Sequence, residues 1–339
     1  MKAVFVVHLG GPRNLQVREV PEPAPGRGEV RIRVRAAGVN FADALMRMGM
    51  YPGAPKLPFV PGYEVAGVVD AVGAGVTTRK EGDRVLAATN YGGYSEAVVV
   101  KEQQAFPIPV DKDFDSAAAL PVNYLTAYVA LVVQANARPG ESLFVHGAAG
   151  GVGVAAVQLG KLLGLAPLFG TASASKHDFL RREGVAHPID YRTEDFEEAV
   201  RRLTGGRGVD IVMDPVGGES FKKSYRLLAP LGRLICYGFS GAATGRTRSL
   251  LRLGWEFVST PRFSPTDLML ENRAVFGLHL GRLTGNEKLL GDAMGRLLQW
   301  WKDEKISPVV GATFKLDEAA KAHAYLQDRK NIGKVVLIV

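Results

Sequence analysis

The spacing of hydrophobic and polar positions changes twice along the chain and divides it into three stretches. In the first third, polar and apolar residues alternate, most clearly over Glu29–Ala36, and Pro and Gly separate the alternating runs. This period of two is typical of half-buried β-strands. We predict further strands over 1–7, 62–72 and 83–88, so the chain is expected to begin with an all-β, barrel-like domain.

The middle of the chain alternates short apolar runs with stretches of helical spacing. Ser116–Leu131 is rich in Ala and Leu and predicts a helix. Strands are then expected at 142–146, 167–170, 187–191, 209–214, 233–238 and 274–280, and helices at 151–163, 175–183, 196–203 and 218–228. Strands that alternate with helices predict parallel βαβ units and therefore a doubly wound sheet.

The last stretch does not continue this alternation. Apolar residues at helical spacing predict an amphipathic helix over Asn286–Trp301. Asp317 is expected to cap a helix that ends at Leu326, and a final strand is expected over Lys334–Val339. We therefore expect the tail to return to the first domain.

A glycine-rich motif, His146-Gly147-Ala148-Ala149-Gly150-Gly151-Val152-Gly153, lies between a predicted strand and a predicted helix. Glycine lets the backbone approach a pyrophosphate, and a helix N-terminus offers unpaired N–H groups and the positive end of its dipole. Glycine also occurs in tight turns for steric reasons alone, but here the turn opens a whole series of strands and helices. We predict a dinucleotide site at Gly150, Gly151 and Val152.

The end of the second strand of this domain favours NADPH over NADH. An NAD site places a carboxylate about 20 positions after the glycines, whereas here no acid follows the strand before Asp178. Ser173 can donate to a 2′-phosphate, Lys176 can neutralise it, and Tyr191 can add a hydroxyl. The alternative interpretation is that Lys176 is a solvated lysine at the start of a helix.

Composition narrows the class of protein. The net charge is +8, but 42 basic residues are interleaved with 34 acidic ones along the whole chain, so nucleic-acid binding is not expected. The single cysteine, Cys236, excludes an intrachain disulfide. No run approaches the roughly 20 apolar residues that span a bilayer. The N-terminus does not resemble a signal peptide, and a cytoplasmic location is the expectation.

The order of barrel, glycine-rich turn, six-strand domain and returning tail resembles the medium-chain dehydrogenase/reductase superfamily over essentially the whole chain. Zinc-dependent members have a cysteine after a Gly-Val pair and a histidine in a Gly-His-Glu motif. Here these positions hold Asn40 and Tyr63, and neither is a good zinc ligand. We therefore expect no metal, and one cysteine cannot build the family's four-cysteine structural zinc lobe.

The resemblance implies an α/β fold with two domains. A GroES-like β-barrel catalytic domain is expected at 1–121 and 284–339, and an NADPH-binding Rossmann domain at 122–283. Asn40-Phe41-Ala42-Asp43, with Arg47, Gly49, Tyr51 and Pro52, resembles the quinone oxidoreductase branch. The runs 122–128, 170–177, 187–191 and 209–215 are similar to the vesicle amine transport protein-like subgroup.

This branch implies a zinc-independent, NADPH-dependent reductase of quinones or α,β-unsaturated carbonyls, with the nicotinamide in a cleft between the domains. The resemblance places near the nicotinamide or in the cofactor shell Asn40, Tyr51, Thr126, Phe239, Phe276, Leu278 and Asn331. Tyr51 is the candidate proton donor, and Asn40 a neutral hydrogen-bond donor in place of zinc. Alternatively, both only shape an apolar pocket. Asp43 and Glu64 are interpreted as structural acids.

Segment 245–263 interleaves Arg246, Arg248 and Arg252 with apolar and aromatic residues. This pattern is typical of a mobile lid over the substrate, which is the interpretation we favour, or of a segment that makes a weak contact with an anionic membrane surface.

The apolar run 274–280 lies at a predicted sheet edge, and the family pairs this strand across a two-fold axis, so we expect a homodimer. The alternative function is a non-enzymatic NADPH-binding protein at a membrane surface or in a complex.

Overall fold

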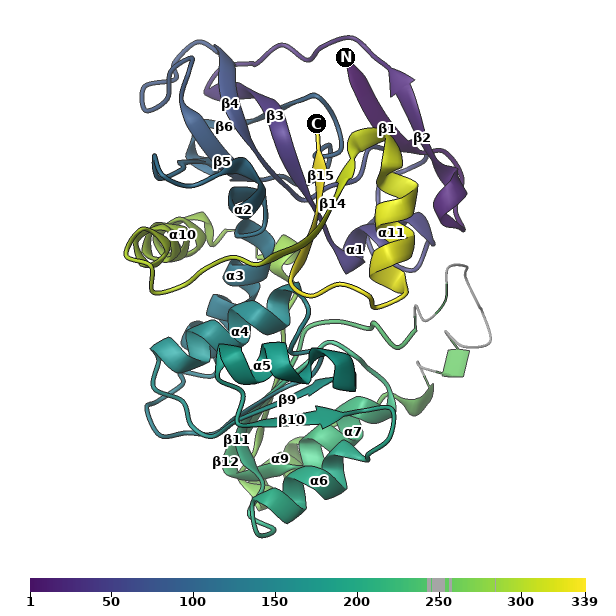
Figure 1. Ribbon diagram of the computed structural model, residues 1–339, viewed down its shortest axis with the longest axis vertical. Coiled ribbons are helices and arrows are strands. Elements are labelled where there is room, and N and C mark those ends of the chain that lie inside the picture. The colour runs from purple at the N-terminus through teal and green to yellow at the C-terminus, as the bar shows by residue number, and fades with distance from the viewer. Residues whose placement is uncertain (243–244, 246–253, 256–257, 284) are drawn as a thin grey trace. The chain divides into compact units, whose positions relative to one another are not determined.

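The computed structural model of the chain describes residues 1–242, 245, 254–255, 258–283 and 285–339 (Figure 1). These residues form two compact units. The first unit holds residues 1–125, 245 and 285–339, and the second holds residues 126–242, 254–255 and 258–283. Within the described ranges, no helix is long and apolar enough to cross a membrane.

The first unit is built on a seven-stranded sheet of order β14-β15-β3-β4-β5-β7, with β6 paired to β3. Its strands are β3 (Glu29–Val39), β4 (Glu64–Val72), β5 (Arg84–Ala88), β6 (Ala97–Lys101), β7 (Ala105–Pro107), β14 (Val310–Lys315) and β15 (Lys334–Ile338). A separate antiparallel pair is formed by β1 (Lys2–Val6) and β2 (Leu15–Glu19). The predicted strands of the first third are confirmed, but this stretch is not all-β, because residues 41–47 form a helix between β3 and β4. The return of the tail is also confirmed, because β15 pairs antiparallel with β3.

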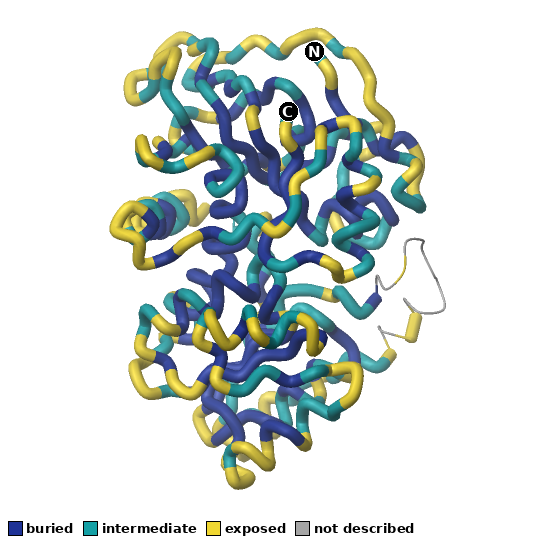
Figure 2. Tube along the Cα trace, in the orientation of Figure 1, coloured by how far each residue is buried: buried dark blue, intermediate teal, exposed yellow. Residues whose placement is uncertain are grey.

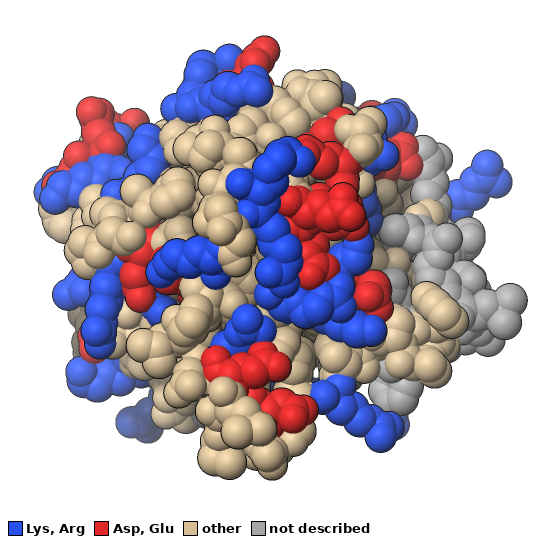
Figure 3. Space-filling view, turned by 90° about the horizontal axis from the view of Figure 1, so that it is seen from below, with Lys and Arg blue, Asp and Glu red and all other residues tan. Residues whose placement is uncertain are grey.

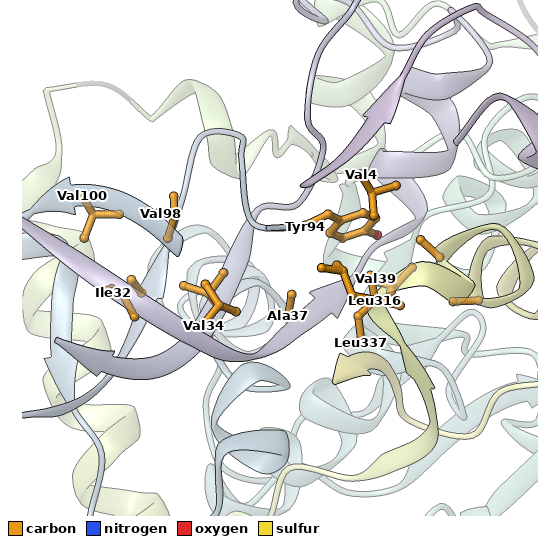
Figure 4. Packing of buried hydrophobic residues seen from close by; sticks show 14 of the residues in the cluster. Val4, Ile32, Val34, Ala37, Val39, Tyr94, Val98, Val100, Leu316 and Leu337 are labelled. Carbon is orange, nitrogen blue, oxygen red and sulfur yellow. The ribbon is translucent and has the colours of Figure 1, made fainter. Parts of the chain in front are cut away.

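Strand β3 connects the sheet to its core. Val30, Ile32 and Val34 are buried, whereas the alternate residues Arg31 and Arg33 both form ion pairs with a carboxylate of the neighbouring strand. This pattern fits a strand with one face in the core. Figure 4 shows the buried side chains along β3 close to the residues that they pack against in other elements, which are Val4, Tyr94, Val98, Val100, Leu316 and Leu337.

The helical elements of the first unit are α1 (Phe41–Arg47), α2 (Phe114–Ala118), the first part of α3 (Pro121–Tyr128), α10 (Glu287–Lys302), α11 (Ala319–Gln327) and the 3-10 turns η1 (Pro12–Asn14), η2 (Glu102–Gln104) and η6 (Leu316–Glu318). The single helix predicted over Ser116–Leu131 is wrong. α2 ends at Ala118 and α3 starts at Pro121, because proline cannot continue a preceding helix but suits a first turn.

Two further details of the helices differ from the prediction. The stretch that follows α3 is a π-helix, η3 (Val129–Gln134), rather than a continuation of the same helix. Asp317 does not cap α11, because it lies inside η6 and the N-cap of α11 is Glu318. The 3-10 turn therefore moves the start of α11 beyond the position expected from the sequence.

The second unit is a Rossmann-type domain. Its six strands lie in the order β10-β9-β8-β11-β12-β13, and all pairings are parallel. The strands are β8 (Leu143–Val145), β9 (Leu168–Ala172), β10 (His187–Asp190), β11 (Val209–Asp214), β12 (Leu228–Cys236) and β13 (Ala274–Gly277). The helices and turns are α4 (Gly151–Leu162), α5 (His177–Glu183), α6 (Phe196–Leu203), α7 (Glu219–Arg226), α9 (Pro265–Glu271), η4 (Ala174–Lys176) and η5 (Leu280–Arg282). The predicted α/β fold class with a doubly wound parallel sheet is confirmed.

The inner strands β8, β9 and β11 are buried at every residue and belong to the dark blue stretches of the trace in Figure 2. Continuous burial explains why these strands are apolar runs rather than alternating patterns. β12 begins at Leu228, earlier than predicted. Its register against β11 shifts near its start, and Leu231 has a φ of 65°, an irregularity that interrupts the apolar pattern.

Basic and acidic side chains are intermixed on the surface. In the second unit, Arg207 pairs with Asp210 at 2.7 Å, and Arg233 pairs with Glu141 at 2.6 Å. The face drawn in Figure 3 shows Lys and Arg groups interrupted by Asp and Glu groups. On the described part of this face, the net positive charge is therefore not gathered into one continuous basic surface.

Candidate functional site

The glycine-rich turn leads directly into α4. Gly150 is the N-cap, with φ −81° and ψ 177°, and it has no capping side chain. The first helical hydrogen bond runs from the N–H of Val154 to the carbonyl of Gly150 at 2.8 Å. The N–H groups of Gly151, Val152 and Gly153 precede this bond, so they point out of the helix end and are placed to bind an anion.

Three contacts fix the shape of this turn. A Cβ on Gly153 would lie 2.3 Å from the carbonyl oxygen of Gly147, so a larger residue cannot fit there. The side chain of Thr171 accepts a hydrogen bond from the N–H of Gly147 at 3.0 Å, and its carbonyl accepts one from Ala148 at 3.0 Å. Sequence reasoning missed Thr171, because a threonine directly after the predicted strand 167–170 carries no signal of this role.

The predicted 2′-phosphate residues lie where β9 and β10 end. Ala172 of β9 pairs with Asp190 of β10, so Ser173 and Tyr191 follow directly after a paired position. Ser173 is buried, Tyr191 is exposed, and Lys176 is partly buried at the end of η4. The parallel register thus places Ser173 and Tyr191 at the same edge of the sheet.

The carboxylate of Asp190, which the sequence did not predict as part of the site, lies at the same edge of the sheet. Asp190 accepts hydrogen bonds from the N–H of Ala174 and from the N–H of Arg192, both at 3.0 Å. The bond from Arg192, followed by that from Ala174, holds the pKa of this carboxyl below its usual range. The linear sequence shows no acid before Asp178, and the acid that the fold does bring to this edge comes from the neighbouring strand.

The remaining predicted cofactor residues of the second unit come from different elements of the fold. Thr126 is buried on α3, and Phe239 is half exposed, with its ring edge-to-face against Phe221 at 5.7 Å. Near Phe276, which is partly buried, the N–H of Leu278 donates to Cys236 at 2.9 Å. The carbonyl of Gly277 accepts from the side chain of Gln134 at 3.0 Å. The N–H of Leu278 and the carbonyl of Gly277 are thus already hydrogen-bonded within the protein.

In the first unit, Asn40 follows β3 directly as the N-cap of α1, and it belongs to a buried polar cluster. Its Nδ2 donates to Oε1 of Glu64 at 2.8 Å, and its Oδ1 accepts from Nζ of Lys334 at 2.6 Å. Lys334 also forms an ion pair with Glu64 and lies 3.5 Å from Oδ1 of Asn123. The second carboxylate oxygen of Glu64 accepts from the N–H of Val122 at 2.7 Å. Lys334 was missed by sequence reasoning, because it is the polar first residue of an apolar strand.

Asp43 forms the centre of a second buried cluster. One oxygen accepts from the N–H of Asn40 at 2.8 Å and from the hydroxyl of Tyr94 at 3.1 Å, and the other accepts from the N–H of Gly62 at 3.1 Å. Burial raises the pKa of Asp43 to about 6, although these hydrogen bonds and the nearby Lys334 act in the opposite direction. These contacts agree with the interpretation of Asp43 as a structural acid.

The second cluster extends to α11. The hydroxyl of Tyr94 lies 3.1 Å from Nε2 of His323, and Nδ1 of His323 accepts from Arg47 at 3.4 Å. Arg47 also donates to Gln327 at 2.6 Å and to the carbonyl of Gly10. Burial, together with the charge of Arg47, lowers the pKa of His323 to about 3. The arginine is therefore the permanent charge here, and the histidine is neutral at ordinary pH.

Tyr63, at the position where the resemblance led us to expect a zinc-binding histidine in metal-dependent members, lies in a group of three tyrosines. Its ring is 6.3 Å from that of Tyr51 and 5.8 Å from that of Tyr91. Its hydroxyl donates to the sulfur of Met46 at 3.4 Å, and burial, with the nearby Tyr51, raises its pKa well above the usual range. The structure therefore brings Tyr51 beside Tyr63.

Three other points complete the predicted site. Asn331 is buried and donates to the carbonyl of Gly333 at 2.8 Å, so its amide holds the turn before β15. Among the described residues, no group of three or more His, Cys, Asp or Glu side chains could hold a metal ion. In segment 245–263, Arg246, Arg248 and Arg252 lie outside the described residues, whereas Trp255 and Val258 are exposed.

Comparison with known proteins gives the family. Residues 26–110 match the alcohol dehydrogenase GroES-like domain, and residues 183–337 match the family described as zinc-binding dehydrogenase. The synaptic vesicle membrane protein VAT-1 homolog of Homo sapiens is 45% identical over 324 residues, which are 96% of this chain and 82% of that protein. The chain therefore belongs to the medium-chain dehydrogenase/reductase superfamily, in the branch of the VAT-1 homologues and quinone oxidoreductase-like proteins.

Two solved structures of this fold were determined with a cofactor. The quinone oxidoreductase of Escherichia coli, complexed with NADPH, is 30% identical, covers 100% of both chains and has a TM-score of 0.87. A mycobacterial protein complexed with NADPH is 33% identical, covers 100% of both chains and has a TM-score of 0.88. The class of enzyme defined by this fold and these relatives is the oxidoreductases.

Proposed function

We propose that the protein is a zinc-independent, NADPH-dependent reductase of quinones or α,β-unsaturated carbonyls. The observation that carries the proposal is the state of the two metal-ligand positions. Asn40 is held between Lys334 and Glu64, and Tyr63 packs between two other tyrosines. A hydrogen-bond donor and an aromatic surface suit a flat conjugated carbonyl compound better than a metal-bound alcohol.

The second unit fits NADPH. The helix end at Gly151–Gly153 suits the pyrophosphate, and the close approach of Gly153 to Gly147 leaves the turn without side chains that would obstruct it. Ser173, Lys176 and Tyr191 are proposed to bind the 2′-phosphate. The NADPH complexes of two structural neighbours support the same cofactor for this chain. When bound, NADPH supplies the hydride, and the protein supplies orientation and exclusion of water.

The side chains of the protein are then needed mainly to stabilise and protonate the carbonyl oxygen of the substrate. Hydride addition to a conjugated carbon moves the π-electron pair of the conjugated system toward the carbonyl oxygen, which becomes negative. A neutral donor such as Asn40 stabilises that charge, in the role that an oxyanion hole plays in other enzymes. Protonation completes the reaction, and Tyr51 is the proposed proton donor. Thr126, Phe239, Phe276, Leu278 and Asn331 are proposed to complete the surroundings of the cofactor.

The test is consumption of NADPH by chelator-treated protein with ortho-quinones, para-quinones and enones, and with NADH as the matched control. We expect turnover that prefers NADPH and does not change after metal removal or zinc addition. Restoration of activity by zinc would contradict the metal-free assignment, and the best substrate of the panel would choose between quinone and double-bond reduction.

A second candidate function is NADPH binding without turnover, at a membrane surface. Two observations favour it: the VAT-1 homologues are named for the vesicle membrane, and Trp255 and Val258 are 70% and 78% exposed within the basic segment 245–263. NADPH binding without turnover, together with binding to anionic liposomes that is lost on deletion within 245–263, would support this candidate. Liposome binding that survives the deletion would oppose it, and turnover that needs the segment would favour the lid.

The protein is also proposed to form a homodimer through β13. This strand has one neighbour, β12, among the described strands, so its other edge is available for pairing with a second copy. Light scattering that gives the mass of a monomer would contradict the dimer.

A further inference from the structure

The feature that the proposed function does not explain is a lysine inside the core of the first unit. Lys334 is 2% exposed, Glu64 is fully buried, and Asn40 and Asn123 are 8% and 4% exposed. We call these four residues the lysine–amide cluster. A buried charge pair is seldom the most stable way to fill a core, because both charges lose their hydration. Its presence beside a candidate catalytic amide therefore points to a role in function.

The cluster fixes the orientation of Asn40. An ammonium group can only donate hydrogen bonds, and a carboxylate can only accept them. Lys334 therefore requires the oxygen end of the amide, and Glu64 requires the nitrogen end, as the two distances of 2.6 Å and 2.8 Å show. Rotation of the amide by 180° would set Nδ2 against the ammonium and Oδ1 against the carboxylate. Asn40 therefore has one favourable orientation.

The fixed orientation leaves one donor of Asn40 unused. The amide nitrogen carries two hydrogens, and the described residues supply one acceptor for them, Oε1 of Glu64. The ammonium of Lys334 on the amide oxygen also draws electron density from the nitrogen, which strengthens the remaining N–H as a donor. The remaining hydrogen is thus oriented and polarised in advance.

We propose that Lys334 is a positioning residue that orients and polarises Asn40 to donate to the carbonyl oxygen of a quinone or enone. The inference rests on the proposed function and explains how a neutral amide replaces a Lewis acid. One C–H bond forms between the transferred hydride and the conjugated carbon, NADPH is oxidised to NADP⁺, and the π-electron pair reaches the oxygen. Asn40 stabilises the resulting negative charge until a proton arrives from Tyr51 or water.

Glu64 has a separate part in this arrangement. It balances the charge of Lys334, so the cluster as a whole is neutral, and its other oxygen is held by the N–H of Val122. Removal of Lys334 alone would leave a buried carboxylate without its partner, which destabilises proteins strongly. The informative variant therefore removes both charges together, by Lys334→Met with Glu64→Gln, so that the net charge does not change.

The first experiment compares turnover in the wild type, the neutral double variant, Asn40→Ala and the triple variant that combines them. We expect kcat for a para-quinone to fall about 10- to 100-fold in the double variant, with less than about threefold change in the Kd of NADPH. If Lys334 acts through Asn40, the triple variant is no slower than Asn40→Ala, because effects on one unit are not additive. If the factors by which the double variant and Asn40→Ala each lower kcat multiply in the triple variant, the proposal is overturned.

Two controls separate positioning from stability. The exposed pair Lys288 and Asp292, with an N–O distance of 3.0 Å, is changed in the same way by Lys288→Met with Asp292→Asn, and we expect no change in kcat. Lys334→Arg keeps the positive charge and should restore part of the lost activity. If the double variant melts well below the wild type, turnover is measured at a temperature where both are folded, and unchanged kcat would overturn the proposal.

The second experiment does not need turnover. The coloured enolate anion of 2-hydroxy-1,4-naphthoquinone resembles the negative oxygen of the reaction, and its Kd is measured from its absorbance, with and without NADP⁺. We expect a Kd about tenfold weaker in the double variant and in Asn40→Ala, because both lose the polarised donor. If the wild type reduces no quinone or enone, the proposed function fails, and this binding still decides the role of Lys334. Equal enolate binding by the wild type and both variants, or no binding at all, would refute it.

Discussion

The carboxylate of Asp43 accepts a hydrogen bond from the N–H of Gly62 at 3.1 Å, across 19 positions of the chain. Its other oxygen accepts from the N–H of Asn40 at 2.8 Å. One buried carboxylate therefore joins the two segments that carry Asn40 and Tyr63, the residues that the sequence analysis expects at the metal-ligand positions of zinc-dependent members. These segments need no metal ion to be held together.

The same carboxylate predicts an unusual pH dependence of stability. Burial raises the pKa of Asp43 to about 6, so the folded state holds this proton more tightly than the unfolded state does. As pH rises from about 4 to about 6, the contribution of Asp43 to stability falls by about 3 kcal/mol. His323, with its pKa lowered to about 3, acts oppositely, and its contribution is lost as pH falls from about 6.5 toward 3.

Between pH 4 and 6 the two contributions cancel, each changing by about 1.4 kcal/mol per pH unit. We expect His323→Gln to gain stability relative to the wild type as pH falls through this window, and Asp43→Asn to lose it. The measurement is urea unfolding at several pH values, expressed as the difference from the wild type at each pH. If the difference in unfolding free energy between each variant and the wild type stays constant with pH, neither group titrates in this way.

Gly38 is predicted to be necessary for the lysine–amide cluster. A Cβ at this position would lie 2.6 Å from Oε1 of Glu64 and 2.7 Å from the carbonyl of Ala118. We expect Gly38→Ala to displace Glu64 and to reduce the free energy of unfolding by about 1–3 kcal/mol. Gly295→Ala, on an open face of α10, is the matched control and should be neutral or stabilising by up to about 1 kcal/mol. Equal stability of the two variants would show that Glu64 can move aside easily.

Lys176 is predicted to select NADPH. We expect Lys176→Met to weaken binding of 2′,5′-ADP about tenfold, equivalent to about 1.4 kcal/mol, and to leave 5′-ADP unchanged, because the lost charge faces the 2′-phosphate. Calorimetric titration of the two nucleotides measures this, and Lys222→Met, an exposed lysine on α7, serves as the control. Equal weakening of both nucleotides would support the alternative that Lys176 is a general surface charge.

Tyr51 is predicted to donate a proton in the reaction, whereas its neighbour Tyr63 is not. Tyr63 is a poor acid, because burial raises its pKa well above the usual range and its hydroxyl donates to Met46. We therefore expect Tyr51→Phe to lower kcat at least about tenfold and Tyr63→Phe to leave it within about threefold, as judged from initial rates. If Tyr51→Phe turns over as fast as the wild type, Tyr51 only shapes the pocket.

Most of the second unit could be predicted from the sequence, because its strands are short apolar runs and its helices have a regular apolar stripe. Phe196–Leu203 and Val209–Asp214 agree with the structure at both ends. Agreement is poorer where the local pattern is interrupted. The irregular backbone at Leu231 hides the start of β12, and Pro121 divides an apparently continuous helix.

The residues that support the candidate site were harder to foresee than those predicted to bind the cofactor. The glycine-rich turn is contiguous, so its spacing alone identifies it. Thr171, Asp190 and Lys334 act through contacts with segments that are distant in the sequence, and a threonine, an aspartate and a lysine at strand ends carry no signal by themselves. Such roles depend on register and on which strands become neighbours, and one sequence does not supply this information.

The position of β15 beside β3 also has a consequence for the synthesis of the protein. Lys334 is made 294 residues after Asn40, so at roughly 5–20 residues per second the two groups are separated by about 15–60 s on the ribosome. During this interval the end of β3 has no strand partner on the side that β15 later occupies, and Glu64 has no cation beside it. The second unit, whose strands are contiguous in the sequence, can fold before the first unit is complete. We therefore expect the nascent chain to depend on chaperones for its N-terminal part and to finish that part last.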